Sequence, residues 1–189
     1  MRAMSLLLLL FSSLASGAPK VVETIEYYNV EPTSPATMLA ELFSASPIME
    51  DDEQFLGYTN SYVEWEWFWK TRNGKCRIVE VTSSVDITYT MPRLVPHYSN
   101  SKVKQIWNRW YPRLMYHERN HGQHAIDTAY LGEQEISRLQ PTNDCKTLDA
   151  KASEIANQLI EQMGTLDEEY DARTNHGSTE GVDIEDYLK

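Results

Sequence analysis

The fold is decided by residues 62–81, which read YVEWEWFWKTRNGKCRIVEV. Before the turn, large apolar residues alternate mostly with charged ones and share one face: Val63, Trp65, Trp67 and Trp69. This period of two is typical of a strand with one buried face. Asn73-Gly74 favours a two-residue hairpin turn, because both residues tolerate the positive φ angles that such a turn requires. The sequence therefore predicts an antiparallel hairpin with one buried face.

The predicted sheet extends outward from this hairpin. The return strand keeps the alternation through Val79, Val81, Val85, Ile87 and Tyr89, until Met91-Pro92 stops it. Upstream, residues 21–30 are rich in β-branched and aromatic residues and predict a first strand. A short helix is expected to begin near Ser34-Pro35, since proline suits the first helical turn, and to end before Pro47. Residues 46–53 are acidic and indicate a surface loop.

The sequence after the sheet has a helical pattern. Two long helices are predicted, from Ser101 to about Leu139 and from Thr147 to about Tyr170. Pro112 is expected to kink the first helix, because proline has no backbone N–H to donate. Strands followed by long helices indicate an α+β fold, here an antiparallel β-hairpin sheet packed on two long helices. We expect one domain over residues 19–177, since about 170 residues suffice for a single core.

The two ends of the chain differ in character from this domain. Residues 1–18 combine a short apolar run with small residues near Ala18, which predicts a signal peptide and an exported protein, periplasmic or secreted. No later segment has the length and apolar character of a membrane span. Residues 178–189 are acidic and predict a flexible tail. The formal net charge of -11 argues against nucleic acid as a partner.

The chain has two cysteines, Cys76 and Cys145. In an exported chain they favour one structural disulfide over a redox or metal pair. The alternative is two free buried thiols. A bond across so long a loop contributes on the order of 4 kcal/mol in the chain-entropy model.

The chemistry is concentrated in residues 116–125, which read YHERNHGQHA and contain the motif HExxH. Residues four apart lie on one face of a helix, so His117 and His121 can bind one tetrahedral zinc ion. Glu118 can then act as general base on a metal-activated water and return the proton to the leaving amine. The motif predicts a zincin-like active-site helix with Zn²⁺ as cofactor. A solvated helix face without chemistry is the alternative interpretation.

Catalytic zinc sites usually have a third protein ligand. His124 shares the face of the motif, but seven residues of helix rise by about 10.5 Å, so we expect it beside the site. His176 follows the second long helix, where a loop can deliver it to the metal, and is the preferred third ligand. Carboxylates of that helix are an alternative, such as Glu154, Glu161 or Glu168. Like His124, Tyr170 and Asp171 are candidates for orienting a ligand or for acting as an alternative ligand. They could also stabilise an oxyanion, or serve only in packing and capping.

Taken together, these motifs resemble a bacterial family of predicted secreted zinc-dependent proteases, otherwise described as a domain of unknown function. The resemblance spans nearly the whole mature chain. It rests on Glu26-Tyr27-Tyr28-Asn29-Val30, Gly57-Tyr58-Thr59, Cys76-Arg77-Ile78, His117-Glu118 with His121, Cys145, and Tyr170-Asp171 with Thr174, His176 and Gly177. It implies that His117, His121 and His176 belong to the metal site, that Glu118 is the catalytic acid/base, and that the two cysteines pair.

The sequence therefore predicts an exported zinc metalloprotease of the HExxH type, whose partner is a peptide or protein substrate. Two alternatives stay open. The first is a metal-dependent amidase acting on cell-wall peptides, which would use the same site on another amide. The second is a non-catalytic exported binding module that keeps zinc as a structural ion, closed by four protein ligands.

Overall fold

The computed structural model describes residues 17–50, 52–95, 97 and 99–189, so residues 1–16 of the expected signal peptide lie outside the described residues. The elements are β1 (Lys20–Val30), α1 (Pro35–Ala45), β2 (Met49–Glu50), β3 (Glu53–Gln54), β4 (Tyr58–Arg72), β5 (Lys75–Leu94), α2 (Ser101–Ser137), α3 (Cys145–Thr174) and two short 3-10 helices, η1 (Ser178–Glu180) and η2 (Ile184–Tyr187). The α+β prediction is confirmed, as are the first strand and the two long helices.

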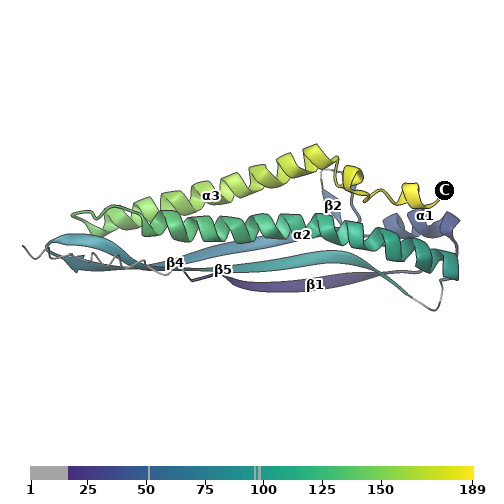
Figure 1. Cartoon of the computed structure of the whole chain (residues 1–189), viewed down its shortest axis with the longest axis horizontal. Helices are drawn as coiled ribbons and strands as arrows, with labels where there is room; N and C mark the ends of the chain where they lie inside the picture. Colours follow the sequence, from purple (N-terminus) through teal and green to yellow (C-terminus); the bar gives the residue numbers. More distant parts are fainter. Residues whose placement is uncertain (1–16, 51, 96, 98) are drawn as a thin grey trace, which may run out of the picture.

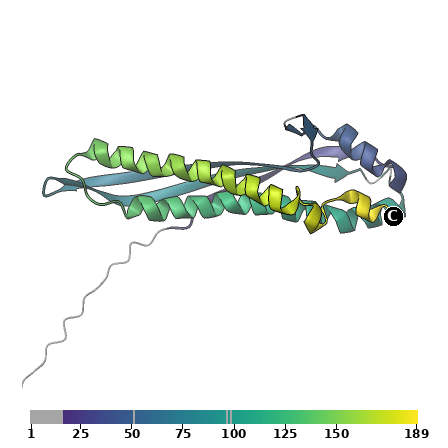
Figure 2. The same ribbon diagram turned by 90° about the horizontal axis from the view of Figure 1, so that it is seen from above.

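The molecule is elongated, and its elements are stacked in layers (Figure 1). The long strands form the bottom layer and α2 runs along them, whereas α3 starts near the hairpin end and rises away from the sheet. Seen from above, α3 crosses over α2 toward the C-terminal end of the chain (Figure 2). The crossing brings the end of α3 above the middle of α2, where the HExxH motif lies.

The main sheet has three strands in the order β1-β5-β4. β4 and β5 form the predicted antiparallel hairpin, with φ angles of 53° at Asn73 and 72° at Gly74. The hairpin is only part of the sheet, because the whole of β1 pairs in parallel with the second half of β5, residues 84–94. β5 also continues past Pro92, where we expected it to stop. β4 begins opposite Thr90, so Pro92 has a strand on one side only, where a missing N–H donor is tolerated.

One side of the hairpin forms the core against α2. Val63 and Trp65 are buried as predicted, at 6% and 8% exposure. Trp69 was predicted on the same face but is 43% exposed. Trp69 pairs with the buried Ile78 and so keeps the core face, although it lies near the open hairpin end. The register shift between Phe68 and Trp69 comes from one extra residue on β5, because their partners are Glu80 and Ile78. Val79, predicted on the core face, is therefore only partly buried, and Ile78 lies in the core at 5% exposure instead.

The long helices have well-defined starts. The side chain of Asn100 caps α2 by accepting a hydrogen bond from the backbone N–H of Val103 at 3.0 Å. α2 then continues through Pro112 as a single helix to Ser137. Asp144 caps α3 by accepting from the backbone N–H groups of the first turn.

The predicted disulfide between Cys76 and Cys145 is present, with a Cα–Cα distance of 5.3 Å. It ties the first residue of α3 to the start of β5. Next to it, the loop between the helices pairs with the same strand: Cys76 N–H donates to the Thr142 carbonyl at 2.8 Å, and Thr142 N–H returns the bond at 3.0 Å. The hairpin end of the sheet and the start of α3 are therefore one connected unit.

The C-terminal segment differs from the flexible tail expected over residues 178–189. It forms η1 and η2 and packs on α2, with Ile184 only 2% exposed. The indole N–H of Trp110 donates to the Val182 carbonyl at 2.6 Å, and the Tyr187 hydroxyl donates to the Gly181 carbonyl at 2.9 Å. The acidic composition of this segment suggested disorder, but the buried side chain of Ile184 and the hydrogen bond from Trp110 to Val182 hold it against α2.

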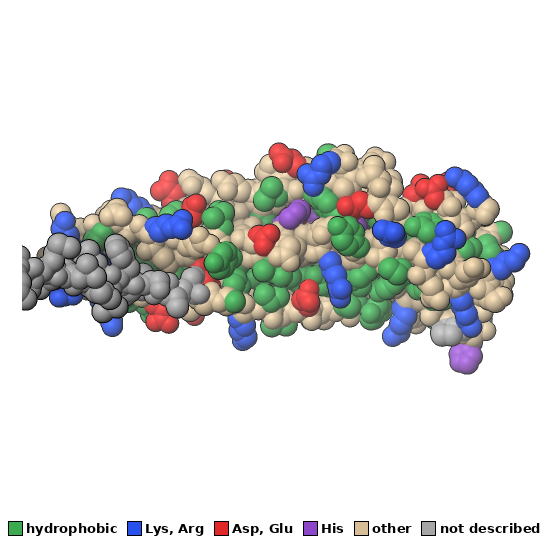
Figure 3. All heavy atoms as spheres, in the orientation of Figure 1, with side chains coloured by type: hydrophobic (Ala, Val, Ile, Leu, Met, Phe, Trp, Pro, Cys, Tyr) green, Lys and Arg blue, Asp and Glu red, His purple; other side chains and the backbone are tan. Residues whose placement is uncertain are grey.

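On the face shown in Figure 3, acidic, basic and apolar side chains are interspersed, with several basic ones toward the right-hand end. Among the described residues, none of the helices combines the length and the apolar character needed to cross a membrane.

Candidate metal centre

α2 carries His117, Glu118 and His121 at the buried side of the helix. His117 and Glu118 are each 5% exposed. Gly122 follows them because a side chain would not fit: a Cβ there would collide with the hydroxyl of Tyr89 on β5. The glycine lets the sheet approach α2 directly below the motif. The alternative interpretation, a solvated helix face, is therefore excluded for His117 and Glu118.

The two histidines converge on one carboxylate of α3. His117 Nε2 lies 3.1 Å from Asp171 Oδ1, and His121 Nε2 lies 3.2 Å from the same oxygen. These three side chains form a group whose ligand atoms lie within 4.8 Å of one another and could hold a metal ion. Asp171 is thus the third member of this group, whereas the sequence analysis preferred His176 as the third ligand.

The opposite nitrogen of each ring is held by a further carboxylate. His117 Nδ1 lies 3.1 Å from Glu180 Oε2 in η1, and His121 Nδ1 lies 2.9 Å from Asp167 Oδ1 in α3. In metalloproteins a carboxylate on one ring nitrogen commonly fixes the tautomer and directs the other nitrogen to the metal. Both rings have this arrangement, so their Nε2 atoms are the ones that are oriented for a shared ligand.

Tyr170 supports the rings instead of facing the cavity. Its ring is stacked on that of His117, with centroids 4.9 Å apart and an interplanar angle of 21°. Its hydroxyl donates to Glu180 Oε2 at 2.7 Å and accepts from Asn120 Nδ2 at 2.7 Å. With both bonds made, the hydroxyl serves to orient Glu180 and His117, which corresponds to the ligand-orienting role considered for Tyr170.

A second group that could hold a metal consists of His121, His124 and Asp167. His124 Nδ1 lies 2.7 Å from Asp167 Oδ1, the same oxygen that His121 Nδ1 contacts. The two groups share His121 but use its opposite nitrogens. His124 is therefore not a member of the first group, and it contacts Asp167 of the second.

Glu118 is fixed at the wall of the site by β4. The Thr59 hydroxyl contacts both Glu118 Oε2, at 2.7 Å, and the Glu118 carbonyl, at 2.9 Å. Gly57 leaves room for the carboxylate, because a Cβ at this position would come within 2.5 Å of Glu118 Oε1. Burial raises the pKa of Glu118, while the Thr59 hydrogen bond and the neighbouring His117 oppose the rise.

The carboxylates around the two histidines favour positive charge in this group. Burial by itself would lower the pKa of His121, but its hydrogen bonds to Asp167 and Asp171 outweigh burial and raise the pKa to about 10. The pKa of Asp171 is lowered, since its bonds to His117 and His121 exceed the opposing effect of burial. The site thus attracts positive charge, which a divalent ion would provide.

His176 lies close to this group but is not a member of either set of possible ligands. It is exposed, and its ring contacts Phe55 at 5.4 Å between centroids. Asn175, His176 and Gly177 all have left-handed backbones, with φ of 51°, 50° and 77°. This turn ends α3 and directs the chain back to η1, which brings Glu180 to His117.

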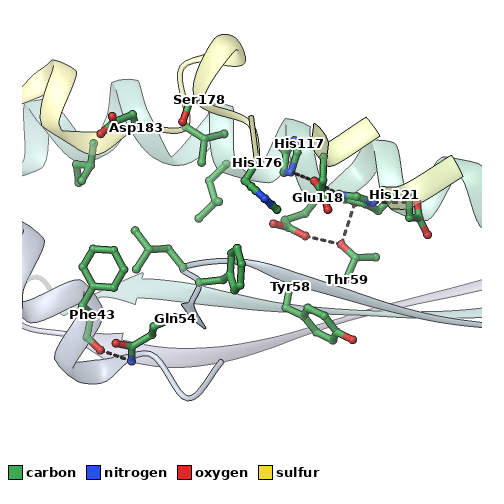
Figure 4. A pocket seen from close by; sticks show the side chains of 18 of the residues that line it. Phe43, Gln54, Tyr58, Thr59, His117, Glu118, His121, His176, Ser178 and Asp183 are labelled. Carbon is green, nitrogen blue, oxygen red and sulfur yellow. Dashed lines mark hydrogen bonds and ion pairs between the residues drawn. The ribbon is translucent and has the colours of Figure 1, made fainter. Parts of the chain in front are cut away.

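The group opens into a cavity of about 500 Å³ between α1, the start of β4, the end of α3 and the C-terminal segment. His117, Glu118, His121, Asp171 and His176 all line it. Figure 4 shows Glu118 and His121 at one end and Phe43 with Asp183 at the other. The cavity is large enough for a small ligand or a few residues of a peptide.

Sequence reasoning missed Thr59, Asp167 and Glu180. Asp167 and Asp171 are four residues apart, the same spacing as His117 and His121, and this spacing could have indicated a matching face on the second helix. Glu180 lay in the segment expected to be flexible, and no local pattern connects Thr59 with α2. Three carboxylates of α3 were alternatives for the third ligand. Of these, Glu168 lines the cavity, whereas Glu154 and Glu161 do not.

Comparison with curated proteins finds no significant match, and neither does comparison with solved structures. A family model does match. The model is described as "Bacterial protein of unknown function (DUF922)", and it covers residues 25–177, most of the chain and all of the side chains that form the two His/Asp groups. The chain therefore belongs to the DUF922 family of bacterial proteins.

Proposed function

We propose that this protein is a zinc-dependent peptidase in which His117, His121 and Asp171 hold the ion. The observation that carries the proposal is the convergence of the two Nε2 atoms on Asp171 Oδ1, at 3.1 and 3.2 Å. Ligands of a tetrahedral zinc at about 2.0–2.2 Å lie about 3.3–3.5 Å from one another, so a small outward movement would admit the ion. Two histidines with one carboxylate are a known ligand set of catalytic zinc.

When bound, zinc would polarise the scissile carbonyl and acidify a water. Glu118 supports catalysis because it is adjacent to a ligand in sequence, lines the same cavity and is held in position by Thr59. Its carboxylate would take a proton from the attacking water and deliver it to the leaving amine. Glu180 and Asp167 would orient the two rings, each through its Nδ1 atom.

The number of donors favours catalysis over a structural ion. Structural zinc sites are normally closed by four protein ligands. Each candidate group among the described residues has three members, and the group with Glu118 beside it faces the cavity. A position for water is expected in such a site, whereas a purely structural role gives no reason for a buried carboxylate at the wall.

The test is to purify the exported form and measure bound metal by elemental analysis in the parent and in three variants. His121→Ala and Asp171→Ala should lose zinc, and His176→Ala should retain it. If His176→Ala loses zinc as Asp171→Ala does, the third ligand is His176 instead. A parent that binds no zinc would refute the proposal.

Activity is tested with the zinc-loaded parent against unfolded proteins, peptides and cell-wall peptide fragments. Glu118→Gln is the matched control, because it keeps the shape of the side chain and can still accept the hydrogen bond from Thr59. Hydrolysis by the parent but not by this variant supports the proposal. Hydrolysis confined to cell-wall fragments would identify an amidase, and equal behaviour of both proteins on every substrate would favour the binding module.

A further inference from the structure

The cavity has two chemically distinct ends. The group of His117, His121 and Asp171, called the metal group below, lies at one end. The other end is lined by apolar side chains: Leu39 and Phe43 of α1, Phe55 and Leu56 before β4, and Val182 and Ile184 of the C-terminal segment. We refer to these six residues as the apolar end. Figure 4 shows Phe43 on one wall and the C-terminal segment on the opposite wall, with open space between them.

The surroundings of the apolar end are acidic. Asp183 and Glu185 stand on both sides of Ile184, and both are exposed although Ile184 itself is 2% exposed. Asp183 is held in place because its Oδ1 accepts the backbone N–H of Glu185 at 2.9 Å. The other end of the cavity carries Glu168 and Asp167. Among the described residues that line the cavity there is no lysine or arginine.

We propose that the cavity selects peptides in which a large apolar side chain is flanked by lysine or arginine. The inference rests on the proposed peptidase function and specifies its substrate. The apolar side chain would occupy the space between Phe43 and Ile184, where it would be removed from water. The basic flanks would approach Asp183 and Glu185 on the rim, so charge complementarity distinguishes such a peptide from neutral or acidic ones.

The two contributions differ in size. A large apolar side chain in a matching pocket is expected to tighten binding by at least about tenfold relative to alanine. The rim carboxylates are exposed, so each basic flank should contribute only about two- to fivefold, and this part should decrease as salt increases. The order of preference is therefore apolar side chain first and charge second.

The experiment measures binding without turnover, using zinc-loaded Glu118→Gln protein and four fluorescent octapeptides. Their central residue is phenylalanine or alanine, and their flanking residues are lysine or glutamate. Fluorescence anisotropy should rank phenylalanine with lysine as the tightest and alanine with glutamate as the weakest. Equal binding of all four peptides would overturn the inference.

Variants assign the preference to this cavity. Phe43→Ala should reduce the discrimination between phenylalanine and alanine, and Asp183→Asn with Glu185→Gln should remove the preference for lysine. Glu64→Gln with Glu66→Gln, at exposed positions of β4, removes the same charge elsewhere and should leave both preferences unchanged. A preference that persists in the cavity variants, or that the control pair abolishes, would place recognition elsewhere and refute the proposal.

The outcome can be separated from that of the proposed function. If the parent binds zinc and hydrolyses all four peptides equally well, the protein is a peptidase and the substrate inference fails. If binding shows the expected preference but neither the zinc-loaded parent nor its Glu118→Gln variant cleaves any peptide, the cavity is selective and the peptidase proposal fails.

Discussion

Replacing Glu180 by alanine should weaken zinc binding by about ten- to a hundredfold, although Glu180 is not a proposed ligand. The carboxylate lies 3.1 Å from His117 Nδ1 and accepts the Tyr170 hydroxyl at 2.7 Å. Its removal frees the imidazole of His117 to change tautomer and to rotate. The expected loss corresponds to about 1.4–2.7 kcal/mol of binding free energy. Glu180→Gln keeps a hydrogen-bond acceptor but loses the charge, so its effect should fall at or below the lower end of this range.

The assay is competition for zinc against a chelating dye, followed by absorbance, with the folded state checked by circular dichroism. Glu161→Ala is the matched control, because Glu161 is an exposed glutamate of α3 that does not line the cavity. If Glu180→Ala binds zinc as tightly as the parent and the control do, the carboxylate does not orient His117. The role assigned to the C-terminal segment would then be wrong.

Three further outcomes are expected. Cys76→Ser with Cys145→Ser should destabilise the protein by about 4 kcal/mol and lower its melting temperature by about 10 °C, since the bond spans 69 residues; a shift below about 2 °C in a thermal melt would contradict this. Gly57→Ala should reduce hydrolysis while leaving zinc content unchanged, because the added Cβ displaces the carboxylate of Glu118; unchanged kcat in a peptide assay would contradict it. In protein freed of metal by a chelator, the pKa of His121 is raised from 6.5 to about 10 in the folded state, so its ion pairs stabilise the fold fully below about pH 6.5. The melting temperature should therefore fall as the pH rises from 6.5 toward 10. His121→Asn should flatten this dependence, and a parent melting temperature that stays constant over this range would contradict it.

The parts of the fold that could be predicted are those with local signals. The alternation around Val63 and Trp65 and the turn at Asn73-Gly74 gave the hairpin, and helical periodicity gave α2 and α3. The parallel partner of β5 could not be predicted, because nothing within β1 specifies which strand it joins. The bulge at Val79 of β5 was not predicted either, since Ile78, Val79 and Val81 are all apolar and their sequence does not show which of them face the core.

The same distinction applies to the candidate site. The pair His117 and His121 follows from the helical repeat, so it could be identified within α2 alone. The third position depends on how α3 is rotated and where it crosses α2, which is set by packing. His176 was preferred because a loop can place a histidine almost anywhere, but the left-handed turn at residues 175–177 carries the chain on to Glu180.

The structure gives a reason for the metal group to lie where it does on α3. Leu148, Ala152 and Leu159 are buried on one face of this helix, and Ile155, Ala156 and Met163 pack against the core beside them. This apolar seam reaches Met163, and from one turn later the carboxylates of Asp167 and Asp171 contact the histidines of α2.

The disulfide fixes the first end of α3 to β5, and the carboxylates of Asp167 and Asp171 meet the histidines of α2 at the second end. An ion shared by α2 and α3 would therefore connect the two helices where carboxylates follow the apolar seam of α3. Because such a site is complete only when the helices are in place, the free energy of metal binding would also stabilise their packing. The metal centre would in this way complete at one end of α3 the attachment that the disulfide provides at the other.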